Sequence, residues 1–419
     1  MLYERWRQIA RNSPGEIALR DLPSDRQWTF HQLEMAADTP SDDAQKIAFP
    51  TGLAAEFILD VLRAWRAGKI VCPVEADQRK PEIPPGLPPE IVHLKMTSGT
   101  TAAPRFVAFT AEQLAADAEN IVATMGLRPD WPNLGVISLA HSYGFSNLVL
   151  PLLLHGIPLV LAGAPLPEIV LRAAKTETAI TLAAVPALWR AWHDADAIPR
   201  NVRLAISAGA PLPVSLEQNV FAALGLKIHN FYGSSECGGI ACDAASDPRL
   251  DDSCAGAPMQ NVNLTVGADG CLEVRSRAVG QTYWPEPGPR LAGGVFRTND
   301  LAEISFGLIY FRGRAGDQMN VAGRKVSPES IEKILLTHPG VRECVVFGVP
   351  SPDDKRGETI VACVSATSSV AGDTLKQFLL AQLPAWQVPR EWWLVESLFA
   401  SARGKLSRVE WRKRYLEKK

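Results

Sequence analysis

The sequence lacks a strong charge excess, a long uninterrupted apolar run and paired-cysteine spacing. Its 43 lysine and arginine residues nearly balance 45 aspartate and glutamate residues. Nucleic-acid backbones and anionic membranes attract clearly basic surfaces, so this balance argues against both as partners. The seven cysteines are scattered without CxxC spacing. This argues against a metal site or a disulfide framework and favours buried thiols in a reducing compartment.

Two segments bear on membranes and export. Residues 1–12 carry charge throughout and have no apolar core of a secretory signal, so we expect a cytoplasmic protein. Residues 148–166 have about the length of a membrane span, but Pro151, Pro158 and Pro165 interrupt them. We expect a buried helix, a turn and a strand there.

Alternating patterns dominate the rest of the chain. Short β-branched apolar runs at 134–140, 159–162, 179–185 and 204–207 predict strands, and residues 111–125 and 216–224 predict helices. This alternation predicts an α/β fold of layered subdomains. Around 262–277 and 294–312, strands separated by turn residues predict a small antiparallel or barrel-like part. A chain of 419 residues is too long for one core, so we expect two domains.

The second domain is predicted to begin after Arg314. Ser327-Pro328 is typical of a helix start, with a capping hydroxyl followed by proline at the first position. Strands are expected at 343–349, 359–365 and 392–395, with a helix at 373–383 and a basic helical tail. We therefore predict a large domain over 1–314 and a small, mobile α+β domain over 315–419.

The strongest local motif is a loop of hydroxyls, one glycine and a cation. It comprises Thr97, Ser98, Gly99, Thr100, Thr101 and, after three further residues, Arg105. Backbone N–H groups, hydroxyls and a guanidinium on a tight loop can surround the oxygens of a triphosphate. A plain Ser/Thr turn fits the same residues. The GxxxxGK[ST] pattern is absent, which argues against a P-loop NTPase.

Four further motifs follow that loop in order. They are Asn230 to Glu236, Thr298-Asn299-Asp300, Arg312 to Gly323, and Gly404-Lys405. Together the five resemble the signatures of the adenylate-forming superfamily of acyl-CoA synthetases, adenylation domains and luciferases, closest to acyl- or aryl-CoA ligases. The resemblance implies an enzyme that uses ATP and Mg²⁺ to convert a carboxylic acid into an acyl-AMP. The acyl group would then pass to the thiol of CoA or of the phosphopantetheine of an acyl carrier protein.

The resemblance also implies roles for individual residues. Those expected to hold ATP are Thr97, Ser98, Gly99, Thr100, Thr101, Arg105, Gly209, Ala210, Asn230, Tyr232, Gly233, Ser235, Asp300 and Arg314. Tyr232 would stack on adenine, and Glu236 would ligate Mg²⁺. Asp300 would accept the ribose hydroxyls, with Arg314 beside it, and Lys405 would neutralise charge during attack on the α-phosphate. Taken singly, a core tyrosine, a solvated glutamate, a turn aspartate and surface cations also fit these positions.

The acid is expected to lack an α-amine. Relatives that adenylate amino acids hold the amine with an aspartate, and residues 139–145 contain no acidic side chain. His141 resembles a position near the acyl pocket and is a catalytic candidate, and a packed core histidine is the alternative. With Tyr143, Val185 and Asn230 it would line a pocket for an aryl or medium acyl group.

Several departures from the family pattern leave alternatives open. Arg105 replaces a lysine, and Gly316, followed by Asp317, stands at the expected hinge. Only 96 residues precede the phosphate loop, fewer than in typical relatives, so part of the first subdomain is expected to be trimmed. The trimmed face is expected to bear on homodimer contacts or on the mouth of the acyl pocket. Arg324 and Lys325 suit the phosphates of CoA or an acidic carrier helix. A nucleotide-binding homologue without turnover is the third possibility.

Overall fold

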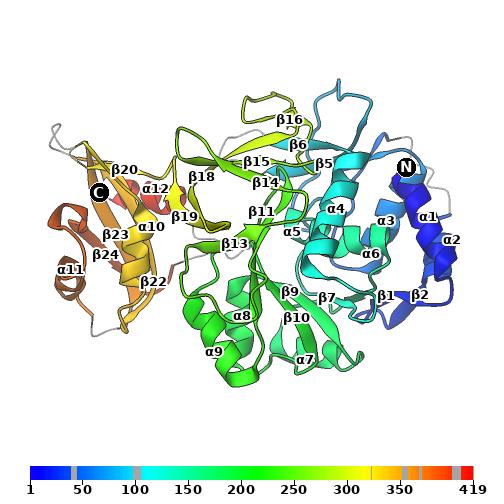
Figure 1. Cartoon of the computed structure of the whole chain (residues 1–419), viewed down its shortest axis with the longest axis horizontal. Coiled ribbons are helices and arrows are strands. Elements are labelled where there is room, and N and C mark those ends of the chain that lie inside the picture. The colour runs from blue at the N-terminus through cyan, green and yellow to red at the C-terminus, as the bar shows by residue number, and fades with distance from the viewer. Residues whose placement is uncertain are drawn as a thin grey trace. The chain divides into compact units, whose positions relative to one another are not determined.

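The computed structural model describes residues 1–38, 45–97, 105–321, 323–351, 357–367, 370–398 and 407–418 (Figure 1). The chain forms two compact units. The first comprises Met1–Thr265, Glu273–Thr298 and Ile304–Ile309, and the second comprises Val266–Leu272, Asn299–Glu303 and Tyr310–Lys419.

A central sheet organises the first unit in the strand order β13-β12-β11-β10-β9-β7-β8-β1-β2. The strands are β1 (Ile17–Asp21), β2 (Arg26–Thr29), β7 (Asn133–Gly135), β8 (Leu159–Leu161), β9 (Ile180–Ala184), β10 (Val202–Ser207), β11 (Ile228–Ser234), β12 (Gly238–Cys242) and β13 (Cys254–Pro258). Neighbours from β11 to β8 are parallel, whereas β12 and β13 add antiparallel strands. The predicted α/β class is therefore confirmed, although β7 is shorter than the run at 134–140 suggested.

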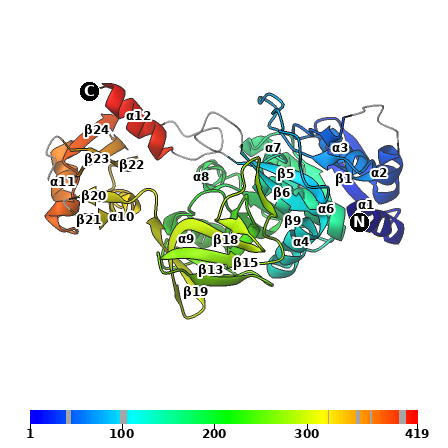
Figure 2. The same ribbon diagram turned by 90° about the horizontal axis from the view of Figure 1, so that it is seen from above.

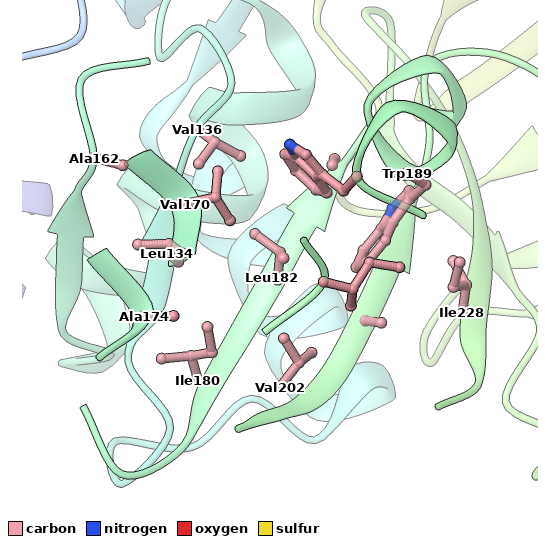
Figure 3. Close-up of a cluster of buried hydrophobic side chains, with 14 of the residues drawn as sticks. Leu134, Val136, Ala162, Val170, Ala174, Ile180, Leu182, Trp189, Val202 and Ile228 are labelled. Atoms are coloured by element: carbon pink, nitrogen blue, oxygen red, sulfur yellow. The ribbon is translucent and has the colours of Figure 1, made fainter. Parts of the chain in front are cut away.

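Helices α7 (Pro167–Ala174), α8 (Pro186–Asp194) and α9 (Val214–Leu224) pack on this sheet. Proline opens α7 and α8, where its missing N–H leaves no helical bond unmade. Figure 3 shows Leu182 of β9 and Trp189 of α8 within the buried cluster. The Trp189 indole donates to the carbonyl of Ile206 at 3.1 Å, so the buried ring has a partner for its polar atom.

A second sheet in this unit has the order β16-β6-β5-β4-β3. Its strands are β3 (Ile47–Ala48), β4 (Ile70–Val71), β5 (Ile91–Thr97), β6 (Arg105–Thr110) and β16 (Thr282–Trp284). Strands β5 and β6 are antiparallel and pair Thr97 with Arg105. Helix α4 (Ala111–Met125) then begins with a capping box between Thr110 and Gln113, over the range predicted from the sequence.

The remaining helices of the first unit lie towards the amino terminus. They are α1 (Leu2–Asn12), α2 (Phe30–Ala37), α3 (Ala55–Arg66), α5 (Ser142–Gly144), the π-helical turn η1 (Phe145–Val149) and α6 (Leu150–His155). The apolar stretch 148–166 is a buried helix, a turn and strand β8, as predicted. Within the described ranges, every helix is too short or too polar to cross a membrane.

Strands also occur where turn-rich sequence predicted them. These are β14 (Asn263–Val266), β15 (Cys271–Arg275), β17 (Leu291–Ala292), β18 (Val295–Ser305) and β19 (Leu308–Arg314). Their order β14-β15-β18-β19 is linear, with β14 at an edge and β17 paired to β18. The strand content was predicted correctly. Of the two alternatives, antiparallel or barrel-like, the barrel is not seen, because the strand order of the described residues does not close.

The second unit is built on the sheet β22-β23-β24, formed by Val341–Pro350, Glu358–Ala366 and Glu391–Val395 (Figure 2). Alternate side chains cover opposite faces. Val346 and Ala362 pack with α10 (Pro328–Leu335) and α11 (Gly372–Leu380), whereas Phe347 and Val361 pack with α12 (Arg408–Lys418). A short hairpin of β20 (Met319–Val321) and β21 (Arg324–Val326) precedes α10.

The expected cap of helix α10 is wrong in one detail. Proline does occupy its first position, but the Ser327 hydroxyl makes no capping bond. It donates to the Glu329 carboxylate at 2.5 Å, and a hydrogen bond from a hydroxyl to a charged acceptor is strong.

Candidate active site

Three candidate residues lie at the carboxyl ends of neighbouring parallel strands. Val185 follows β9, Gly209 follows β10, and Tyr232 lies near the end of β11. Strands β9, β10 and β11 run in one direction, so these ends share one edge, where ligands of α/β sheets bind. Gly209 has φ +85°, and a Cβ there would lie 3.3 Å from the Val185 Cγ1. The edge therefore offers a glycine surface beside a half-buried tyrosine.

Tyr143 packs against the strands that form this edge. Its ring stacks on Phe231 with centroids 6.0 Å apart. Its hydroxyl donates towards the carbonyls of Ala184 at 3.5 Å and Ile206 at 3.4 Å. The side chain is only 8% exposed, and burial raises the pKa of its phenol. Tyr143 thus presents an apolar ring and directs its polar atom to the strand ends.

His141 lies on a short segment tied to the Asn230–Glu236 motif. Its Nδ1 accepts a hydrogen bond from the Tyr143 backbone N–H at 3.2 Å, which places the ring proton on Nε2. The hydroxyls of Ser142 and Ser235 are 2.9 Å apart. A Cβ at Gly144 would lie 2.0 Å from the Ser138 carbonyl oxygen, so only glycine permits this fold of the segment. Sequence reasoning assigned no role to Ser142 or Gly144.

Arg105 and Glu236 meet over a residue that sequence reasoning missed. The Arg105 Cζ lies 3.7 Å from the centroid of the Tyr283 ring. The Tyr283 hydroxyl donates to Glu236 Oε1 at 3.2 Å. Thr97 contributes a hydroxyl that donates to the Arg105 carbonyl at 3.0 Å, while Ser98, Gly99, Thr100 and Thr101 lie outside the described residues. A cation and a carboxylate suited to phosphate and metal thus lie at the end of the β5–β6 hairpin.

The surroundings of Glu236 suit a hard cation shared with phosphate. Its backbone N–H donates to the Ser234 hydroxyl at 3.2 Å, and its carbonyl accepts from Gly280 at 2.8 Å. Across the described part of the chain, no group of three or more His, Cys, Asp or Glu side chains could hold a metal alone. Mg²⁺ is commonly held by one or two carboxylates together with phosphate oxygens, and a single glutamate bonded to Tyr283, whose ring carries Arg105, would fit that pattern.

Two further positions of that motif face the protein. A Cβ at Gly233 would lie 2.6 Å from the Gly238 carbonyl oxygen, which explains glycine there. Asn230 is buried, and its amide donates to the Cys254 carbonyl at 3.4 Å.

Four buried charges brace the segment that carries Gly209 and Ala210. Glu217 is 0% exposed and accepts from the Arg249 side chain and backbone, each at 2.8 Å. Lys227 pairs with both Glu217 and Asp243. Arg249 also donates to the Leu212 carbonyl at 2.7 Å. These residues lie apart in sequence, and their spacing gave no signal of the cluster.

In the second unit, Asp300 and Arg314 form an ion pair. The Arg314 Nε lies 2.8 Å from Asp300 Oδ1. The Arg314 side chain is 60% exposed, so the pair itself contributes little stability. Gly313, with φ +109°, lies against Ser327, whose hydroxyl would be 2.4 Å from an added Cβ. Asp300 and Arg314, both expected near ribose from the resemblance, are thus neighbours.

The expected hinge lies beside a half-buried arginine. Asp317 pairs with Arg408, which also binds Glu329 at 2.9 Å and Glu332 at 2.9 Å. Burial raises the pKa of Glu332, although Arg408 opposes that shift. Gly316 has open space around it and no left-handed φ, so this conformation does not itself require glycine. Lys405 lies outside the described residues.

The segment expected to line the thiol path, residues 320–325, spans the hairpin of β20 and β21. Gly323 has φ +78° at its turn, a backbone conformation that glycine adopts without strain. The Arg324 guanidinium carbon lies 5.0 Å from the centroid of the Trp386 ring.

Known proteins resemble this chain in sequence and in fold. The chain is 27% identical to feruloyl-CoA synthase from Amycolatopsis sp. over 362 residues, covering 81% of this chain and 73% of that protein. It is 26% identical to 2-succinylbenzoate–CoA ligase from Bacillus cereus over 343 residues, covering 77% and 70%. The crystal structure of ATP-bound MatB from Rhodopseudomonas palustris matches with a TM-score of 0.87 at 19% identity, covering 99% of both chains.

Two family models also match. The model of AMP-binding enzymes matches residues 54–284, more than half of the chain, and the model of the AMP-binding enzyme C-terminal domain matches residues 330–405. The resemblance inferred from the five motifs is therefore confirmed. The chain belongs to the AMP-binding enzyme family.

Proposed function

We propose that the chain is an acid:CoA ligase for an aryl or medium acyl carboxylic acid. The reaction has two steps, and the chain is proposed to comprise a large domain over 1–314 and a small domain over 315–419. Family membership and the curated CoA ligases and synthases support ATP-dependent activation of an acid and formation of a CoA thioester. The observation that carries the proposal is that Arg105 and Glu236 both contact Tyr283. The Arg105 Cζ lies 3.7 Å from the ring centroid, and the Tyr283 hydroxyl donates to Glu236 Oε1 at 3.2 Å. Opposite charges held at the end of a hydroxyl-rich hairpin suit MgATP.

In the first step, a carboxylate oxygen of the acid attacks the α-phosphorus of ATP. The new O–P bond forms as the bond to pyrophosphate breaks. Arg105 and the hydroxyls of the loop hold the phosphates, and Lys405 neutralises the charge that develops at the α-phosphate. When bound at Glu236, Mg²⁺ supplies charge neutralisation on the leaving pyrophosphate.

The nucleoside is proposed to be held through its base and its ribose by different residues. Tyr232 stacks on adenine against Gly209 and Ala210, and Asp300 accepts the ribose hydroxyls with Arg314 beside it. The short Asp300–Arg314 contact supports this role, because the arginine fixes the carboxylate in one orientation.

The acid pocket is proposed to be apolar. Tyr143 and Val185 present rings and methyl groups at the sheet edge, with His141 and Asn230 as the polar members. Residues 139–145 hold no carboxylate for an α-amine. The feruloyl and 2-succinylbenzoyl groups named for the curated relatives are aromatic, which supports an aryl acid here.

In the second step, the thiol of CoA attacks the acyl carbon, and AMP leaves. We propose that the small domain reorients at Gly316 and Asp317 between the steps and that residues 320–325 then line the thiol path. The phosphopantetheine of an acyl carrier protein is the alternative acceptor, because Arg324 and Lys325 suit an acidic carrier as well as CoA phosphates.

Carboxylate-dependent ATP–pyrophosphate exchange over a panel of aryl and fatty acids tests the first step. Exchange with at least one aryl or medium acyl acid is expected, and thioester formation with CoA should exceed that with a holo carrier protein. Exchange with none of the acids would refute the enzymatic proposal and leave a nucleotide-binding homologue. Thioester formation with the carrier alone would replace CoA by that acceptor.

A further inference from the structure

The segment 280–284, which includes β16, contacts the phosphate end of the site along its whole length. The Gly280 N–H donates to the Glu236 carbonyl at 2.8 Å, and the Gln281 N–H donates to the Ala108 carbonyl of β6 at 2.8 Å. Tyr283 pairs with Val107 in the β16–β6 ladder. This segment therefore fixes the Tyr283 backbone against the strand that begins at Arg105.

The Tyr283 side chain touches both charged groups of the site. It is 7% exposed, with Arg105 over its ring and Glu236 at its hydroxyl. The Tyr283 hydroxyl is the donor in its 3.2 Å hydrogen bond to Glu236 Oε1. A Cβ at Gly288 would lie 2.9 Å from an Arg105 guanidinium nitrogen. A glycine at 288 thus leaves room for the cation to rest on the ring.

This arrangement keeps the Arg105 guanidinium and the Glu236 carboxylate available to a ligand. A guanidinium and a carboxylate close together tend to pair with each other, and each then neutralises the other. Here the guanidinium rests on an aromatic face, a weaker interaction for an accessible cation. The carboxylate accepts from a neutral phenol, which leaves its negative charge in place. Both groups keep their charges for phosphate and metal.

We propose that Tyr283 is a positioning residue that aims Glu236 at Mg²⁺ through its hydroxyl and holds Arg105 for the nucleotide phosphates through its ring. This inference rests on the proposed function of the site. It assigns separate effects to the two parts of one side chain. Loss of the hydroxyl should weaken the metal-dependent part of ATP binding, and loss of the ring should weaken the metal-independent part as well.

Isothermal titration calorimetry of the full chain with ATP, in saturating Mg²⁺ and in EDTA, measures the ATP affinity without metal and the gain in affinity from Mg²⁺. Tyr283→Phe should reduce the gain in ATP affinity from Mg²⁺ about tenfold, since one hydrogen bond to a charged group is lost. It should leave ATP affinity in EDTA within about twofold, because the ring remains. Tyr283→Ala should also lower affinity in EDTA.

Tyr3→Phe is the matched control. The Tyr3 hydroxyl donates to Asp38 at 3.2 Å, the same length as the bond from Tyr283 to Glu236. Its removal deletes a phenol–carboxylate bond away from the site, so the Mg²⁺ gain should equal that of wild type.

A double-mutant cycle with Glu236→Gln decides whether Tyr283 acts through Glu236. Tyr283→Phe should have no further effect on the Mg²⁺ gain in the Glu236→Gln background. Independent, additive effects would overturn the inference, as would a Tyr283→Phe variant with the wild-type Mg²⁺ gain. If wild type binds MgATP but exchanges pyrophosphate with no acid, the proposed function fails while the binding comparison still tests Tyr283.

Discussion

Removal of the Glu217 carboxylate should destabilise the first unit more than any surface change of the same type. Glu217 lies in α9, is 0% exposed and binds both Lys227 and Arg249. In Glu217→Ala, these two cations remain buried with Asp243 as the carboxylate left in the cluster. Breaking a buried ion pair from one side destabilises by about 3–5 kcal/mol, because a charge is left without its partner.

Urea unfolding followed by tryptophan fluorescence measures this loss, since Trp189 and Trp192 belong to the same core cluster as Leu216 and Val220 of α9. Glu217→Gln should lose less than Glu217→Ala, because the amide keeps the volume and an oxygen acceptor for the Arg249 N–H. Glu168→Ala, at an exposed site in the first turn of α7, should change stability by less than about 0.5 kcal/mol.

A second substitution tests the charge argument directly. Lys227 keeps Asp243 as a partner when Glu217 is replaced, whereas Arg249 loses its carboxylate. In the Glu217→Met background, Arg249→Met removes that cation and should recover part of the lost stability. A Glu217→Ala loss below about 1 kcal/mol, or a double variant no more stable than Glu217→Met, would refute the reasoning. Folded Glu217→Ala protein should also bind ATP more weakly. Glu217 positions Arg249, and Arg249 donates to the Leu212 carbonyl next to the segment that carries Gly209.

Three other predictions concern the site and its pH dependence. Lys405→Ala should lower pyrophosphate exchange about 100-fold or more while ATP affinity changes little, since its charge is needed mainly in the transition state; equal exchange rates would contradict this role. Gly144→Ala should destabilise the fold and lower acid affinity, because its Cβ would meet the Ser138 carbonyl oxygen at 2.0 Å; wild-type melting and acid affinity would count against the contact. Burial lowers the pKa of His93 well below its usual value and that of His155 to about 4. Unfolded histidine titrates near pH 6.5, so the unfolded state binds more protons below that pH and stability should fall as pH drops from 6.5 towards 4. His93→Phe should flatten the loss measured by urea unfolding between pH 6.5 and 5.5, and an unchanged slope would exclude His93 as a source.

Local sequence was sufficient for the elements and for the family. Helix α4 was predicted over its full length, because Thr110 and Gln113 form a capping box and Gly126, with φ +64°, ends the helix. The strands of the second unit followed from short strand-like apolar runs, and the five motifs identified the AMP-binding family. Such signals lie within a few neighbouring residues, so an extended chain already carries them.

Contacts between distant segments decided the rest. Residues 105, 236 and 283 meet only after β16 pairs with β6 and Gly280 binds the Glu236 carbonyl. The cluster around Glu217 likewise needs α9, β11 and the chain near Arg249 to pack together. Turn-rich sequence also predicted a barrel-like part where the strand order is open, because strand patterns give the number of strands and leave their partners undetermined. The sequence by itself determined which chemical groups are available to this enzyme, and tertiary packing decided which of them touch, since a charge acquires its role from its neighbours in space.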